Sequence, residues 1–202
     1  MKRLFYISVF LLFFIKILHA QTKGFEGGLL FGLVPSQVDG DTYGGYNKIG
    51  IEAGGFTRFV FNKTYSLQME IKYIQKGAKA ASKDNFLYYK SSLNYMEVSV
   101  SLQYLYHDKF IGEAGISLGY LFKASETFGS LVVSPPDPPF ESYEIAGQVG
   151  IGYIISDNWI IMNHFSYSIL PIRWYPKDNR HLKDLGCNNN VIRISVYYKF
   201  GS

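Results

Sequence analysis

After Gln21 the sequence alternates apolar and polar residues in eight long runs, which turn-forming residues separate. This alternation predicts β-strands, because successive side chains of a strand point to opposite faces. Each run has about 11–15 residues, whereas strands of soluble proteins have about 5–6 and a tilted membrane-spanning strand needs about 9–11. Strand length therefore favours a membrane-spanning sheet, with strands expected at 24–34, 48–62, 65–77, 92–106, 109–123, 143–156, 159–170 and 190–200.

The connections between these runs alternate in length. Tight turns are expected at Asn62-Lys63-Thr64, His107-Asp108 and Ser156-Asp157-Asn158, and long loops at 35–47, 78–91, 124–142 and 171–189. An even number of strands with short turns on one side and long loops on the other is typical of outer-membrane barrels. The sequence predicts an all-β fold, an eight-stranded antiparallel up-and-down transmembrane β-barrel with periplasmic turns and termini and extracellular loops.

The side chains on the two strand faces indicate which face meets lipid. One face is crowded with Phe, Tyr and Ile, which are too bulky to fill the narrow interior of eight strands. The other is rich in Gly with a few charges, whereas a water-facing strand surface favours Thr and Lys over Gly. The apolar face is therefore expected to contact lipid, with Asn163 as a polar exception on the strand at 159–170.

The first twenty residues have the pattern of an export signal. Lys2 and Arg3 precede the apolar run 4–15, and Ala20 supplies a small residue before a cut at Gln21. We therefore expect a signal peptide over 1–20 and a barrel domain over 21–202. Removal of Lys2, Arg3 and Lys16 lowers the formal net charge from +4 to +1, which argues against binding of nucleic acid.

Charged residues on the polar face are the candidate functional residues. We expect them to point into the lumen, where an isolated buried charge costs several kcal/mol and must be paired. A structural plug of salt bridges is the favoured interpretation, because eight strands leave little room for water. A path for protons or ions is the alternative. The residues are Glu52, Arg58, Glu70, Lys72, Glu97, Glu113 and Arg193.

Two other groups of polar residues are candidates for a catalytic or a metal site. His164, Ser166 and Ser168 share one face opposite several Glu residues, but the spacing simply follows the strand pleat and no nucleophile elbow is present. Asp39-Gly40-Asp41 lacks the further ligands of a calcium loop and is interpreted as a turn. We therefore predict no catalytic residue, no metal and no cofactor.

The charges of the long loops alternate in sign around the ring, so neighbouring loops are expected to neutralise one another. The groups are Asp39 and Asp41; Lys76, Lys79, Lys83 and Lys90 against Asp84; Glu126, Asp137 and Glu141; and Arg173, Lys177, Arg180 and Lys183 against Asp178 and Asp184. Cys187, the single cysteine, follows Gly186 in the last loop and is expected to be an exposed free thiol.

Three stretches of this sequence resemble the PorT-type outer-membrane β-barrel family. They are the segment 36–41, the segment 45–50, and 70–77 with its continuation at 93–98. The motif residues are Asp39, Gly40, Asp41, Gly45, Lys48, Gly50, Glu70, Lys76, Gly77, Tyr95 and Glu97. The resemblance implies an eight-stranded OmpA- or OmpX-like barrel. The family is named after a component linked to type IX secretion, but the resemblance transfers no secretion role and no catalytic residue.

These observations predict a non-enzymatic, monomeric outer-membrane barrel with a structural or interaction role. Its expected contacts are outer-membrane lipid and envelope or secretion proteins. Two alternatives remain: an outer-membrane enzyme that modifies lipid, and a soluble periplasmic barrel that binds an apolar ligand in its interior.

Overall fold

The computed structural model describes residues 24–41, 44–80, 88–174 and 186–201, and it is all-β there. The predicted signal peptide and its cleavage site lie outside the described residues, as do Lys83, Lys177, Arg180 and Lys183 of the loops. Among the described residues, no helix is long and apolar enough to span a membrane. The strands are β1 (Phe25–Asp39), β2 (Lys48–Val60), β3 (Tyr65–Lys76), β4 (Tyr89–Tyr106), β5 (Phe110–Phe128), β6 (Leu131–Val133), β7 (Tyr143–Ile154), β8 (Trp159–Ser168) and β9 (Asn188–Lys199).

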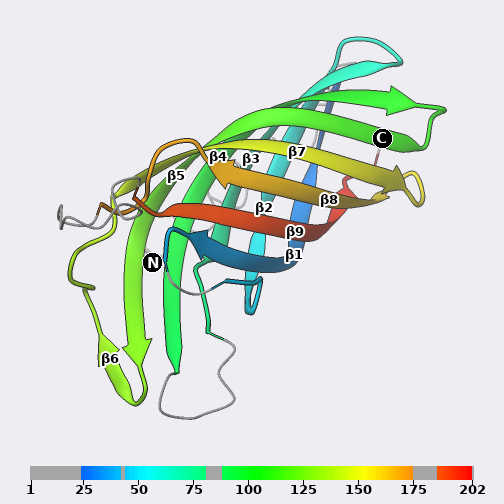
Figure 1. The fold of residues 1–202 in the computed structure, drawn as a ribbon. Coiled ribbons are helices and arrows are strands. Elements are labelled where there is room, and N and C mark those ends of the chain that lie inside the picture. The colour runs from blue at the N-terminus through cyan, green and yellow to red at the C-terminus, as the bar shows by residue number, and fades with distance from the viewer. Residues whose placement is uncertain (1–23, 42–43, 81–87, 175–185, 202) are drawn as a thin grey trace, which may run out of the picture.

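Eight of these strands form a closed antiparallel barrel (Figure 1). Each pairs with its neighbours in the order β4-β3-β2-β1-β9-β8-β7-β5, and the pairing of β4 with β5 closes the ring. Closure satisfies the backbone hydrogen bonds of every strand, which a bilayer requires because it offers no water to an open edge. The predicted eight-stranded up-and-down barrel is confirmed.

Strand pairing continues into all four of the segments that the sequence predicted to be long loops. β1 pairs with β9 as far as Asp39, and β4 pairs with β5 as far as Tyr89 and Phe128. The short β6 then pairs with the end of β5. Figure 1 shows this β4–β5–β6 unit projecting beyond the other strands. The expected strands 24–34, 92–106 and 109–123 were therefore too short, because cross-strand pairing extends them past the alternating pattern.

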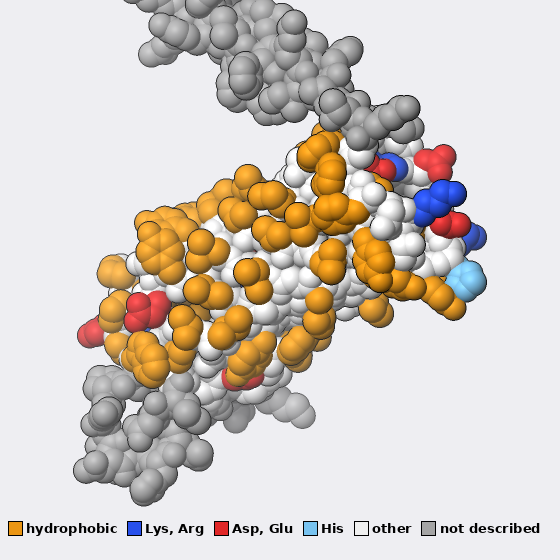
Figure 2. Space-filling model, turned by 90° about the horizontal axis from the view of Figure 1, so that it is seen from above, with side chains coloured by type: hydrophobic (Ala, Val, Ile, Leu, Met, Phe, Trp, Pro, Cys, Tyr) orange, Lys and Arg blue, Asp and Glu red, His pale blue; other side chains and the backbone are white. Residues whose placement is uncertain are grey.

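The apolar side chains lie on the outside of the barrel. Figure 2 shows them across the flank of the molecule, with charged side chains gathered towards the ends. Aromatic pairs occur at both limits of this surface. Trp159 packs against Tyr198 near the short turns, and Tyr120 packs against Tyr143 towards the long loops. Such belts mark the two membrane interfaces.

The interior holds two apolar clusters and a set of buried charges. A cluster that includes Leu30, Phe56 and Met162 lies towards the short turns, and one that includes Val34, Ile74 and Leu93 lies towards the long loops. Arg193 lies on β9 between Val191 of the second cluster and Tyr197 of the first. Lys76 lies level with the second cluster, directly opposite Leu93 in the register of β3 and β4. The buried charges therefore begin between the clusters and continue towards the long loops.

The lipid-facing assignment predicts a position-dependent cost for an added charge. Ile116, 61% exposed, faces outward between the aromatic belts, and Leu131, 65% exposed, lies on the projecting β6. We expect Ile116→Arg to lower the free energy of unfolding in lipid vesicles by about 2–4 kcal/mol. The matched Leu131→Arg is expected to change it by less than about 0.5 kcal/mol. Urea titration followed by tryptophan fluorescence measures both, and equal losses would contradict the assignment.

Candidate functional site

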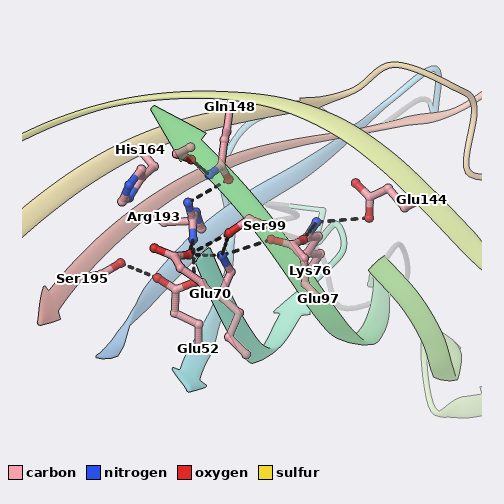
Figure 3. Close-up of polar contacts among 12 residues, drawn as sticks. Glu52, Glu70, Lys76, Glu97, Ser99, Glu144, Gln148, His164, Arg193 and Ser195 are labelled. Carbon is pink, nitrogen blue, oxygen red and sulfur yellow. Dashed lines mark hydrogen bonds and ion pairs between the residues drawn. The ribbon is translucent and has the colours of Figure 1, made fainter. Parts of the chain in front are cut away.

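The lumen holds a connected network of buried charges (Figure 3) and, beside it, a separate pair of Glu113 and His164. Among the described residues these two groups comprise five carboxylates, three lysine or arginine cations and a histidine, supplied by seven different strands. Every carboxylate accepts at least two hydrogen bonds or ion pairs, which offsets the cost of its removal from water. The members are Glu52, Glu70, Glu97, Glu113, Glu144, Lys72, Lys76, Arg193 and His164.

Arg193 and Lys72 form the centre of the network. Arg193 reaches across the lumen to Glu52 at 3.1 Å and Glu70 at 3.7 Å, and it donates to Gln148. Lys72 contacts Glu70 at 2.5 Å and Glu97 at 3.2 Å. These contacts tie β2, β3, β4, β7 and β9 together across the interior. They are possible because Gly54 of β2 lacks a side chain, and a Cβ there would meet Lys72 Cβ at 2.6 Å.

Lys76 connects the centre to the far wall. Its ammonium lies 2.7 Å from Glu97 and 3.1 Å from Glu144, over the ring of Tyr95 at 5.2 Å. Glu144 also accepts hydrogen bonds from Ser168 and Asn189. Lys76 was expected among the loop charges, and Glu144 was not among the charges expected in the lumen. The alternation of β7 places Glu144 on the polar face and was the signal that could have identified it.

His164 and the nearby serines are not arranged as a catalytic triad. His164 Nε2 lies 2.9 Å from Glu113, and its buried Nδ1 has no hydrogen-bond partner among the described residues. Ser168 donates instead to Glu144 at 2.7 Å. A triad needs the imidazole between the serine and the carboxylate, and no described hydrogen bond joins a serine to this imidazole.

Arg58 is buried but lies apart from the central network. It pairs with Glu26 at 2.6 Å near the short turns, and Lys199 contacts the same carboxylate at 3.1 Å. Five of the other six charges expected in the lumen belong to the connected network, whereas Glu113 pairs separately with His164 and Gln103.

At the long-loop end, Arg173 joins the last loop to the projecting β5. Its guanidinium donates two hydrogen bonds to Glu126, at 2.8 and 3.0 Å, and stacks 3.7 Å from the ring of Phe140. Tyr89 donates to the same carboxylate at 2.6 Å. Burial and the adjacent Glu126 raise the pKa of the Tyr89 hydroxyl well above its ordinary value, so it remains a donor. This is one contact of the kind expected from opposite charges on neighbouring loops.

Cys187 is buried, and the expectation of an exposed thiol was wrong. Its backbone pairs with Arg173 in an isolated bridge, which draws the side chain into the apolar cluster with Ile172 and Val191. No local sequence pattern predicts this bridge, because it depends on contacts between the two ends of one loop.

The motif residues at the end of β1 and in the connection to β2 shape the long-loop end of the barrel. Gly40 has a φ of +92°, and a Cβ there would lie 2.4 Å from the carbonyl oxygen of Gly186. Gly45, with a φ of +98°, donates its N–H to the side chain of Gln37. Asp39 accepts hydrogen bonds from Gln37 and Asn190. Within the described ranges, no group of three or more His, Cys, Asp or Glu is placed to hold a metal ion.

Comparison with known proteins decides the family. The family model described as outer membrane protein beta-barrel domain matches residues 19–172. The chain belongs to this outer-membrane β-barrel family. No curated protein matches the sequence.

Solved outer-membrane barrels have the same fold. Ail, the attachment invasion locus protein of Yersinia pestis, is 17% identical with a TM-score of 0.51, over 89% of this chain and 100% of that one. Neisserial surface protein A is 15% identical with a TM-score of 0.52, over 88% of this chain and 98% of that one. At these identities the likeness shows the architecture alone.

The network predicts that loss of one central cation is costly. Arg193→Met removes the cation that contacts Glu52 and one of the two cations that contact Glu70, and we expect it to lower the free energy of unfolding by about 3–5 kcal/mol. The control Lys199→Met removes a partly exposed cation whose partner Glu26 keeps Arg58, and should cost less than about 1 kcal/mol. Urea unfolding in vesicles measures both. Similar small losses would show that the network does not stabilise the barrel.

The Arg173–Glu126 contact predicts local order at the long-loop end. Arg173→Ala should speed amide hydrogen exchange at Ile172 and Cys187 at least about tenfold, because it removes a charged bidentate contact. Arg173→Lys, which keeps the charge, should give an intermediate rate. Unchanged exchange in the alanine variant would show that the backbone bridge alone orders this loop.

Proposed function

We propose that this outer-membrane barrel is non-enzymatic and has a closed lumen, and that its long loops contact envelope partners or its rigid wall stabilises the membrane. The observation that carries the proposal is the ion-pair network of Arg193, Lys72 and Lys76. These cations lie inside the lumen, each 1% exposed and paired with carboxylates, and apolar clusters pack beside them. In a barrel filled in this way, the side chains that partner molecules can reach lie at the ends rather than along a pore.

The charged lumen residues act in this proposal as a structural plug. Pairing of Glu70 with two cations and with the hydroxyl of Tyr197 supports the plug over an ion path, because an ion would have to displace partners already in contact. The separate contacts of His164 and Ser168 support the absence of catalysis. We therefore assign no residue to an enzymatic role.

The orientation in the membrane is part of the same proposal. A signal peptide over 1–20 exports the chain, the domain 21–202 forms the barrel, the turns and termini face the periplasm, and the long loops face outward. The finer assignment to PorT-type barrels rests on the motif that includes Asp39, Gly40, Lys76 and Glu97, and secretion proteins are candidate partners on that ground.

A conductance measurement tests the closed lumen. Full-length protein reconstituted in a planar lipid bilayer should give no regular conductance steps in molar KCl, because the lumen charges are paired and eight strands leave little room for water. A porin added to the same bilayer confirms that steps are detectable. Regular steps from the folded barrel would favour the ion path.

Active-site labelling tests the enzymatic alternative. A fluorophosphonate probe should leave the folded protein unlabelled, since no described serine is hydrogen-bonded to His164. Labelling of the wild type that is abolished by His164→Ala would instead show a reactive serine and overturn the non-enzymatic proposal.

A further inference from the structure

Asn163 places an amide on the lipid-facing surface of β8. Its neighbours along the strand alternate as expected, with Met162 and His164 buried and Ile161 and Phe165 exposed. The side chain of Asn163 makes no hydrogen bond within the described part of the chain. Every other outward residue of this strand is apolar or aromatic.

This amide lies at the middle of the membrane-spanning segment. It is four residues from Trp159 in one aromatic belt and four residues from Tyr167 towards the long loops. A strand that crosses a bilayer needs about 9–11 residues, so Asn163 is far from water and from lipid headgroups on both sides. An amide without a partner in hydrocarbon costs several kcal/mol.

The surroundings of Asn163 give room for another protein surface. In register across the sheet, Gly112 of β5 pairs with Ile151, Ile151 with Asn163, and Asn163 with Ile194 of β9. These residues line a groove of about 570 Å³ on the outside of the barrel. A Cβ at Gly112 would meet no atom within 4 Å, so the wall is hollow there, whereas Ile151 stands out at 72% exposure.

We propose that this groove is the contact surface of a homodimer in which the Asn163 amides of two copies hydrogen-bond to each other. A primary amide carries both donors and acceptors and is complementary to an identical amide across a two-fold axis. Ile151 and Ile194 flank it on the two sides and exclude lipid from the pair. Small residues such as Gly112 allow the close approach that drives association within membranes. A second copy satisfies the amide, which an acyl chain cannot do at this depth.

Association in lipid vesicles tests the dimer. Full-length protein labelled with donor and acceptor fluorophores should show energy transfer that rises with the protein-to-lipid ratio. Asn163→Leu should weaken association about tenfold through loss of the amide pair. Asn163→Gln, which keeps an amide, should restore part of it. Ile71→Leu, on the exposed face of β3, is the control and should associate as the wild type does.

Folding of each variant is checked by its mobility on a detergent gel with and without boiling. Wild-type protein that stays monomeric at every ratio, as the sequence analysis expected, would overturn the proposal. Equal association of Asn163→Leu and wild type would do the same. A photo-crosslinker at Ile161 in intact cells should give an adduct with the mass of two copies, and an adduct only with a different protein would overturn self-association.

Discussion

Pairing of buried charges inside a closed ring of strands is the interaction on which the rest of this structure depends. The ring satisfies the backbone in lipid, but it also encloses five carboxylates that no water can solvate freely. Arg193, Lys72 and Lys76 compensate four of them, and Arg193 and Lys76 do so by contacts between strands that are not neighbours. Loss of one partner leaves a buried charge, so the network is costly to disturb even where its net contribution to stability is small.

Because the interior is filled, the side chains that partner molecules can reach lie at the ends of the barrel and on its outer wall. At the long-loop end, the Arg173–Glu126 pair fixes the last loop against the extended β5, and Gly40 lets β1 pass close to Gly186. On the outer wall, Asn163 breaks an otherwise apolar surface at mid-membrane depth. Both features are compatible with a protein that works through contact rather than through transport or catalysis.

The sequence was sufficient to predict the barrel but not its contacts. Period-two alternation in long runs identified all eight strands and their faces, because burial and backbone geometry impose that pattern directly. It could not show which charges meet, since Lys76 reaches Glu144 across the barrel from a strand that is not its neighbour. The burial of Cys187 and the extension of β5 also depend on pairing between distant segments, which local patterns do not record.

The central claim is that the apolar strand faces meet lipid while the charged faces fill the lumen. Spin labels at single cysteines along β7, in a Cys187→Ser background, test it most directly. Labels at Ile145 and Val149 should collide freely with oxygen dissolved in the bilayer, and labels at Ala146 and Gln148 should be protected from it. The reverse alternation, with the odd positions protected, would place the apolar face inside and contradict the account.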